Sequence, residues 1–70
     1  MKITYDKKID AMYIKLRDGH YDHSKKISDD ILVDVSKKGE VLGVEILDAK
    51  ENIGTINPER LNVEVSVANS

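Results

Sequence analysis

Two carboxylates and a tyrosine are the first residues in this sequence that could do chemistry. Asp34 and Glu45 lie in two short runs of alternating residues, and Tyr13 lies in a third run. In a hairpin made of the first two runs, Asp34 lies across from Gly43. Glu45 then lies across from Leu32, so the two acids are diagonal neighbours within reach of a shared cation. Paired carboxylates of this kind can serve acid-base chemistry or share a metal ion.

Each of these residues also has a structural explanation. Asp34 can bond the amides of a nearby loop, and Glu45 can pair with Lys15 on an adjacent strand. Gly43 can make room for the ring of Tyr13, since a glycine in mid-strand often marks a bulge or the close approach of another group. We expect structural roles to account for most of this cluster, with partner binding as the next explanation and catalysis as the last.

The stretch His20-Tyr21-Asp22-His23 is the one cluster in the sequence with metal-ligand character. Two histidines with an intervening aspartate can bind zinc where a loop folds around the ion. The ligand set is incomplete, because a working site needs further ligands and a second layer of hydrogen bonds. If Tyr21 begins a strand, the two imidazoles also point to opposite faces. We therefore expect no metal and no cofactor, with His20 and His23 as the only candidate ligands.

Length and composition predict one small domain that needs a partner. The chain has 70 residues, 40% of them hydrophobic, and no cysteine. A domain of this size buries only about 60% of its unfolded surface, so its core is marginal. Small domains usually add a disulfide, a metal or a second chain, and the lack of cysteine excludes disulfides and thiolate metal sites. Good packing or association with another chain remains, and a homodimer is the expectation that follows.

Charge limits the classes of partner. Charged residues make up 34% of the chain, both signs are interspersed, and the net charge is −2. Binding to a nucleic-acid backbone needs a basic stripe, so nucleic acid is not the expected partner. No segment approaches the roughly 18 apolar residues of a membrane span. The first ten residues resemble no signal peptide, so we expect a cytoplasmic protein without a membrane partner.

The alternation of apolar residues predicts an α+β fold that is mainly β. We expect a single domain over residues 1–70, built as a small antiparallel β-meander of four or five strands with one or two short helical turns. The central hairpin covers residues 31–47, and the C-terminal segment covers residues 57–70. Strands are expected at residues 2–5, 11–16, 21–27 and 63–67, and helical turns at residues 48–53, with Asp48 as the cap, and 57–61.

The hairpin register sorts the side chains into two faces. If Ser36 pairs with Val41, the inner face carries Met12, Ile14, Leu16, Ile31, Val33, Val35, Leu42, Val44 and Ile46. The outer face carries Ala11, Tyr13, Leu32, Asp34, Val41, Gly43 and Glu45. The inner face must be covered, and the short helical turns are too small for that. A second copy of the sheet would cover it, and the C-terminal valine strand could reach across to that copy.

Several of these residues form a recognisable pattern: Tyr5-Asp6, Asp10-Ala11-x-Tyr13-Ile14-x-Leu16, Val33-Asp34, Gly39 and Gly43-Val44-Glu45-Ile46-Leu47-x-Ala49. The pattern resembles the DUF2283 family of short prokaryotic proteins over roughly residues 2–50. The family has no known function, so the resemblance implies a fold and a cytoplasmic, prokaryotic origin. Some members are encoded beside small toxin-like proteins, which implies an antitoxin-like role. The candidate binding residues at motif positions are Tyr13, Asp34, Gly43, Glu45 and Asp10.

Three functions remain open at this point. The first is a non-catalytic protein-interaction or regulatory module, with a protein partner at the Tyr13–Asp34–Glu45 face or at an exposed strand edge. The second is a carboxylate- or metal-dependent hydrolase whose site lies at a dimer interface. The third is a DNA-binding regulator, which requires a dimer that gathers its lysines onto one face.

Overall fold

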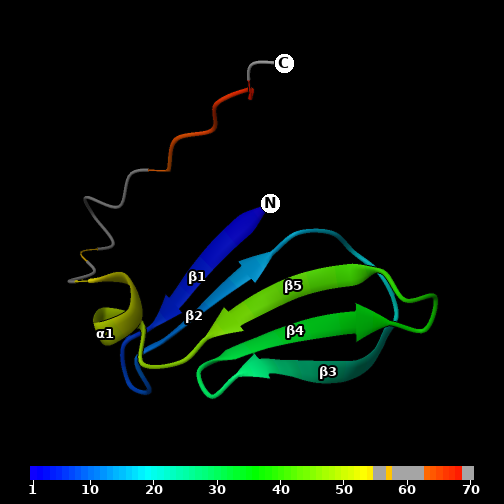
Figure 1. Ribbon diagram of the computed structural model, residues 1–70, viewed down its shortest axis with the longest axis horizontal. Helices are drawn as coiled ribbons and strands as arrows, with labels where there is room; N and C mark the ends of the chain where they lie inside the picture. The colour runs from blue at the N-terminus through cyan, green and yellow to red at the C-terminus, as the bar shows by residue number, and fades with distance from the viewer. Residues whose placement is uncertain (55–56, 58–62, 69–70) are drawn as a thin grey trace.

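The fold is an antiparallel sheet followed by one short helix, which confirms the mainly β class with a short helical turn. The computed structural model describes residues 1–54, 57 and 63–68 of the chain. Figure 1 shows five strands side by side, with the helix at one end of the sheet. The elements are β1 (Lys2–Asp6), β2 (Ala11–Lys15), β3 (Tyr21–Ser28), β4 (Ile31–Ser36), β5 (Val41–Ile46) and α1 (Ala49–Ile53).

The strand order is β1-β2-β5-β4-β3, and every neighbouring pair is antiparallel. The strands β3, β4 and β5 follow one another as a meander, and the β1–β2 hairpin joins them through β5. The order therefore departs from a continuous meander at one place, where β2 neighbours β5 and not β3. Every residue of β3 is exposed, and such a polar strand suits the edge of a sheet. The more apolar β5 takes the central place between β2 and β4.

The register of the central hairpin agrees with the prediction over most of its length. Ile31 lies opposite Ile46, and Val33 lies opposite Val44. The predicted pairing of Ser36 with Val41 is wrong, because Val41 lies opposite Val35 after a shift in register. The shift is a bulge that leaves one extra residue, Leu42, on β5.

The bulge at Leu42 anchors the chain that leaves β2. The Leu42 carbonyl oxygen accepts the backbone N–H groups of Leu16 at 2.8 Å and of Arg17 at 3.2 Å. Its side chain is 6% exposed and lies against Gly19, where an added Cβ would come within 2.6 Å of a Leu42 methyl carbon. Because of the bulge, Val41 shares a face with Val35 and leaves the predicted outer set.

One face of the sheet is aliphatic, and no described helix or strand covers it. Directly paired residues project to the same face, so the register defines this aliphatic face as Ile3, Met12, Ile14, Ile31, Val33, Val35, Val41, Val44 and Ile46. Met12 is 5% exposed and Val41 is 43% exposed, while the other seven are half-buried. No large side chain among the described residues is fully buried. Among the described elements, the sheet therefore lacks the second layer that closes a core.

The described helix does not supply that layer. In Figure 1, viewed along the shortest axis, α1 lies beyond the ends of β1, β2 and β5 and does not overlap the strands. It has five residues, and within the described ranges no helix is long and apolar enough to cross a membrane.

The C-terminal segment differs from the prediction. Residues 63–68 belong to no strand of the single chain, so the prediction of a strand at residues 63–67 is wrong. Val63, Val65 and Val67 are 50%, 81% and 95% exposed, and Figure 1 shows the segment running away from the sheet. Alternating valines form a strand only where a neighbouring strand accepts their hydrogen bonds. The second predicted helical turn falls largely on residues outside the described ranges.

Candidate functional site

The outer face of the sheet carries a row of hydrogen-bonded side chains from three strands. The Tyr13 hydroxyl on β2 donates to Asp34 Oδ2 on β4 at 2.9 Å. The Ser24 hydroxyl on β3 donates to the other carboxylate oxygen, Asp34 Oδ1, at 2.7 Å. Ser24 Oγ lies 2.8 Å from the Tyr21 hydroxyl. Since a serine hydroxyl has a single proton, Tyr21 is the donor in that bond. The row runs Tyr13–Asp34–Ser24–Tyr21.

Gly43 makes this row possible. Tyr13 lies on β2 and Asp34 on β4, so the tyrosine ring must cross β5 to reach the carboxylate. It crosses at Gly43, which lies directly opposite Asp34. A Cβ at Gly43 would collide with the Tyr13 hydroxyl, would lie 2.5 Å from the ring carbon Cζ, and would lie 2.9 Å from the Ile14 carbonyl oxygen. The structure thus shows a packing reason for a glycine in mid-strand.

The electrostatics of the row hold Tyr13 as a neutral donor. Burial raises the pKa of the Tyr13 phenol, and the hydrogen bond to Asp34 raises it further. The negative charges of Asp34 and Glu45 act in the same direction. Both oxygens of Asp34 already accept a hydrogen bond. Asp34 is thus engaged within the row through both of its oxygens.

Glu45 is the one acid of the predicted cluster that the row leaves out. It lies opposite Tyr13 on one side and opposite Leu32 on the other. The predicted ion pair with Lys15 is not formed, because the Lys15 ammonium lies 2.7 Å from Asp18. In the described part of the chain, no hydrogen bond or ion pair engages the Glu45 carboxylate. Glu45 and Leu32 are therefore available to a partner at the outer face.

Asp10 is a structural tie between the β1–β2 turn and the helix. Its Oδ1 atom accepts the Tyr5 hydroxyl at 2.7 Å, a bond that raises the pKa of that phenol. The same carboxylate accepts the backbone N–H of Lys50, at 3.3 Å from Oδ1 and 3.4 Å from Oδ2. The Asp10 carbonyl oxygen accepts the N–H of Ala49 at 3.0 Å. Asp10 thus accepts backbone N–H groups of the first turn of α1 from outside the helix.

The predicted cap residue does not fill that role with its side chain. Asp48 lies at the N-cap position with φ 45° and makes no side-chain cap bond. Asp10 has a similar left-handed backbone, with φ 51°. The prediction of the helix at this place is confirmed, while the prediction that the Asp48 side chain caps it is wrong.

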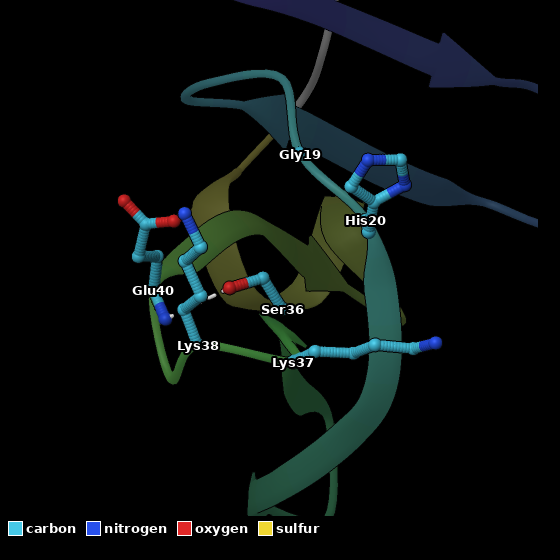
Figure 2. A pocket seen from close by; sticks show the side chains of 6 residues that line it. All are labelled: Gly19, His20, Ser36, Lys37, Lys38 and Glu40. Carbon is cyan, nitrogen blue, oxygen red and sulfur yellow. Dashed lines mark hydrogen bonds between the residues drawn. The ribbon is translucent and has the colours of Figure 1, made fainter.

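A cavity lies away from the outer-face row, at the loops next to β3 and β4. It has a volume of 290 Å³ and is lined by Gly19, His20, Ser36, Lys37, Lys38 and Glu40. Figure 2 shows the ends of Lys37 and Glu40 pointing away from its centre. Ser36 Oγ accepts the backbone N–H of Glu40 at 3.0 Å, and Glu40 pairs with Arg17 at 2.6 Å. None of Tyr13, Asp34 and Glu45 lines this cavity.

The two candidate metal ligands have different surroundings. His20 lines the cavity, whereas His23 Nδ1 lies 2.7 Å from a carboxylate oxygen of its neighbour Asp22. Over the described ranges, no three His, Asp or Glu residues gather in a way that could hold a metal ion.

Sequence reasoning missed three members of these networks. Ser24 and Tyr21 lie on β3, whose pairing with β4 contains two register shifts, so the alternation pattern could not place them. Tyr5 was expected on a strand but not as the partner of Asp10. The sequence feature that could have indicated this bond is that Tyr5 and Asp10 lie only five residues apart, on the two sides of a turn.

The family comparison agrees with the resemblance drawn from the motif. The model of a family described as "Protein of unknown function (DUF2283)" matches residues 2–50. This range contains all five strands and the first residues of α1. The comparison with curated proteins gives no match, and the comparison with solved structures gives none either.

We expect Gly43→Ala to destabilise the protein by about 1–3 kcal/mol, the usual cost of overpacking a well-packed site. The added methyl displaces the Tyr13 ring and breaks the bond to Asp34. Urea unfolding followed by circular dichroism at one fixed protein concentration measures this. In a Tyr13→Ala background the same substitution should cost less, because only the Ile14 carbonyl contact remains. Equal stability of Gly43→Ala and the wild type would contradict the packing role.

We expect Asp10→Ala to lower stability by about 1 kcal/mol more than Asp48→Ala, the typical value of a hydrogen bond. Both positions have a left-handed backbone, so both variants carry the same backbone strain. Only Asp10 loses side-chain bonds to Tyr5 and Lys50. Thermal unfolding of the two variants measures the difference in stability. An equal loss of stability in both would show that the hydrogen bonds of the Asp10 carboxylate do not stabilise the fold.

Proposed function

This chain belongs to DUF2283, a family of proteins of unknown function, and we propose that it is a non-catalytic protein-interaction module that acts as a homodimer. The observation that carries the proposal is the aliphatic face, where seven of nine apolar residues are only half-buried and an eighth, Val41, is exposed. An antitoxin-like regulator would be one form of such a module.

The open face argues for a partner on energetic grounds. Full burial of a Val, Leu or Ile side chain contributes about 1.5–3 kcal/mol relative to exposure. Neighbours within the same layer shield the flanks of these side chains, whereas their ends remain in water. A second layer would bury those ends, as the hydrophobic face of a sheet requires. Association therefore supplies stability that a chain of 70 residues lacks.

A second copy is the partner that suits this surface best. The strand positions of the aliphatic face carry no carboxylate, and the nearest polar groups on the same face are Lys25 and His23 at the β3 margin. Two such faces can stack with their strands roughly aligned, so that side chains from both sheets interdigitate. A two-fold dimer presents the same patch on both partners, and an apolar patch needs no complementary charge to be its own partner.

The outer face supports binding more than catalysis. The carboxylate of Asp34 has a hydrogen bond on each oxygen, and the 290 Å³ cavity lies elsewhere. With the aliphatic face closed by the second copy, Glu45 and Leu32 stay on the exposed side of the dimer. This half-buried pair is the surface that we propose for a regulated protein partner.

Sedimentation velocity at micromolar concentration tests the dimer, and we expect the wild type to sediment with twice the mass of the chain. We expect Val44→Lys to shift the population to monomer or to unfold the protein, since it places a charge between Ile14 and Val33.

Leu32→Lys is the matched control on the opposite face, where the new ammonium lies opposite Glu45. It should leave both the mass and the circular dichroism spectrum of the wild type unchanged. A wild type that is folded and monomeric at these concentrations would overturn the proposal, whatever the variants do.

A further inference from the structure

Three exposed valines alternate along residues 63–67, a segment that belongs to no strand in the described structure. Val65 and Val67 are 81% and 95% exposed, and Val63 is 50% exposed. Figure 1 shows the segment away from the edge of its own sheet. We propose that residues 63–67 of one copy pair as an additional antiparallel strand with the β1 edge of the second copy. This inference rests on the proposed homodimer and names the edge through which its copies exchange strands.

The two edges of the sheet differ in how well they accept a strand. β3 carries Lys25 and Lys26 and has two register shifts, and both features protect an edge from pairing. β1 pairs with β2 in an unbroken register from Lys2 to Asp6. The three central residues of β1 carry no charge, and its outer side presents unpaired backbone groups within the described structure. β1 is therefore the open edge.

The side chains of the segment match those of β1 in one register. With Val65 opposite Ile3, Val63 lies opposite Tyr5, and both valines extend the aliphatic face. Glu64 then lies opposite Thr4 on the outer face. Glu64 is also a diagonal neighbour of Lys2, which carries the opposite charge, and of Asp6, which carries the same charge. A slip by one residue would place Glu64 among the apolar side chains, so the face that each side chain occupies is well specified.

Interface size also favours this arrangement. From a strand spacing of about 4.8 Å and a rise of about 3.4 Å, the aliphatic face has a footprint of roughly 20 Å by 17 Å. Accessible area exceeds a flat footprint because side chains stand up from the sheet. Even so, roughly 300 Å² is small beside the roughly 800 Å² that each partner buries in a standard interface. An added strand contributes apolar contact and main-chain hydrogen bonds.

The chain after α1 is long enough to leave its own sheet before Val63. Residues 54–62 separate the end of α1 from Val63. Extended, these nine residues span up to roughly 30 Å at about 3.3 Å per residue. The backbone N–H of Ala49 donates to the Asp10 carbonyl oxygen, so α1 starts beside the β1–β2 turn, at the β1 side of the sheet.

Disulfide trapping tests the pairing directly, because the chain has no cysteine of its own. Full-length Thr4→Cys and Glu64→Cys proteins are mixed and oxidised, and the product that links the two different chains is quantified by mass spectrometry. We expect this product to form at least about tenfold faster than in a matched mixture of Lys26→Cys with Glu64→Cys, because pairing holds the two thiols at a high effective concentration. Lys26 is the control because it lies on the outer face of the other edge.

Each other outcome has a defined meaning. Equal rates in the two mixtures would overturn the choice of the β1 edge. If the Thr4→Cys/Glu64→Cys double variant forms only a disulfide within one chain, the segment pairs with its own sheet and the exchange is overturned. If no cross-link forms while the wild type sediments as a dimer, the strand exchange fails and the proposed homodimer stands. A monomeric wild type would overturn both.

Discussion

The register of the three central strands is the constraint on which the rest of the structure depends. Side chains alternate between faces along a strand, so one pairing of β4 with β5 decides which residues share a face. With Val33 opposite Val44, the aliphatic residues gather on one side and the acids on the other. A slip by one residue would bring Asp34 and Glu45 among the aliphatic side chains, where unpaired charges are costly.

The two faces that result are stabilised in different ways. On the outer face, the row from Tyr13 through Asp34 to Tyr21 ties β2, β4 and β3 together across the sheet, and Gly43 provides the space for it. At one end, Asp10 ties the first hairpin to α1. On the aliphatic face of the described structure, no comparable network of side-chain hydrogen bonds joins the strands. The motif residues therefore build the scaffold, and the face that they leave open is where a second chain contributes.

Sequence reasoning succeeded where a repeating pattern carries the information. The alternation at residues 31–46 predicted the paired residues of the central hairpin, and the turn signals predicted α1. Sequence reasoning failed where the sequence is compatible with more than one local backbone arrangement. Nothing in the sequence marks Leu42 as an extra residue, because a bulge preserves the apolar character of its strand. The bond from Asp10 to Lys50 joins positions 40 residues apart, which no short pattern reports. The valines of the C-terminal segment predict a strand without naming its neighbour.

The most direct test of the central claim is an isotope-filtered nuclear Overhauser experiment on a mixture of labelled and unlabelled protein. It detects contacts between methyl groups that belong to different chains. We predict such contacts among the methyls of Ile14, Val33 and Val44, and none from Leu32 on the opposite face. Contacts between chains that involve Leu32 alone, or no contacts between chains in a folded sample at millimolar concentration, would contradict the account.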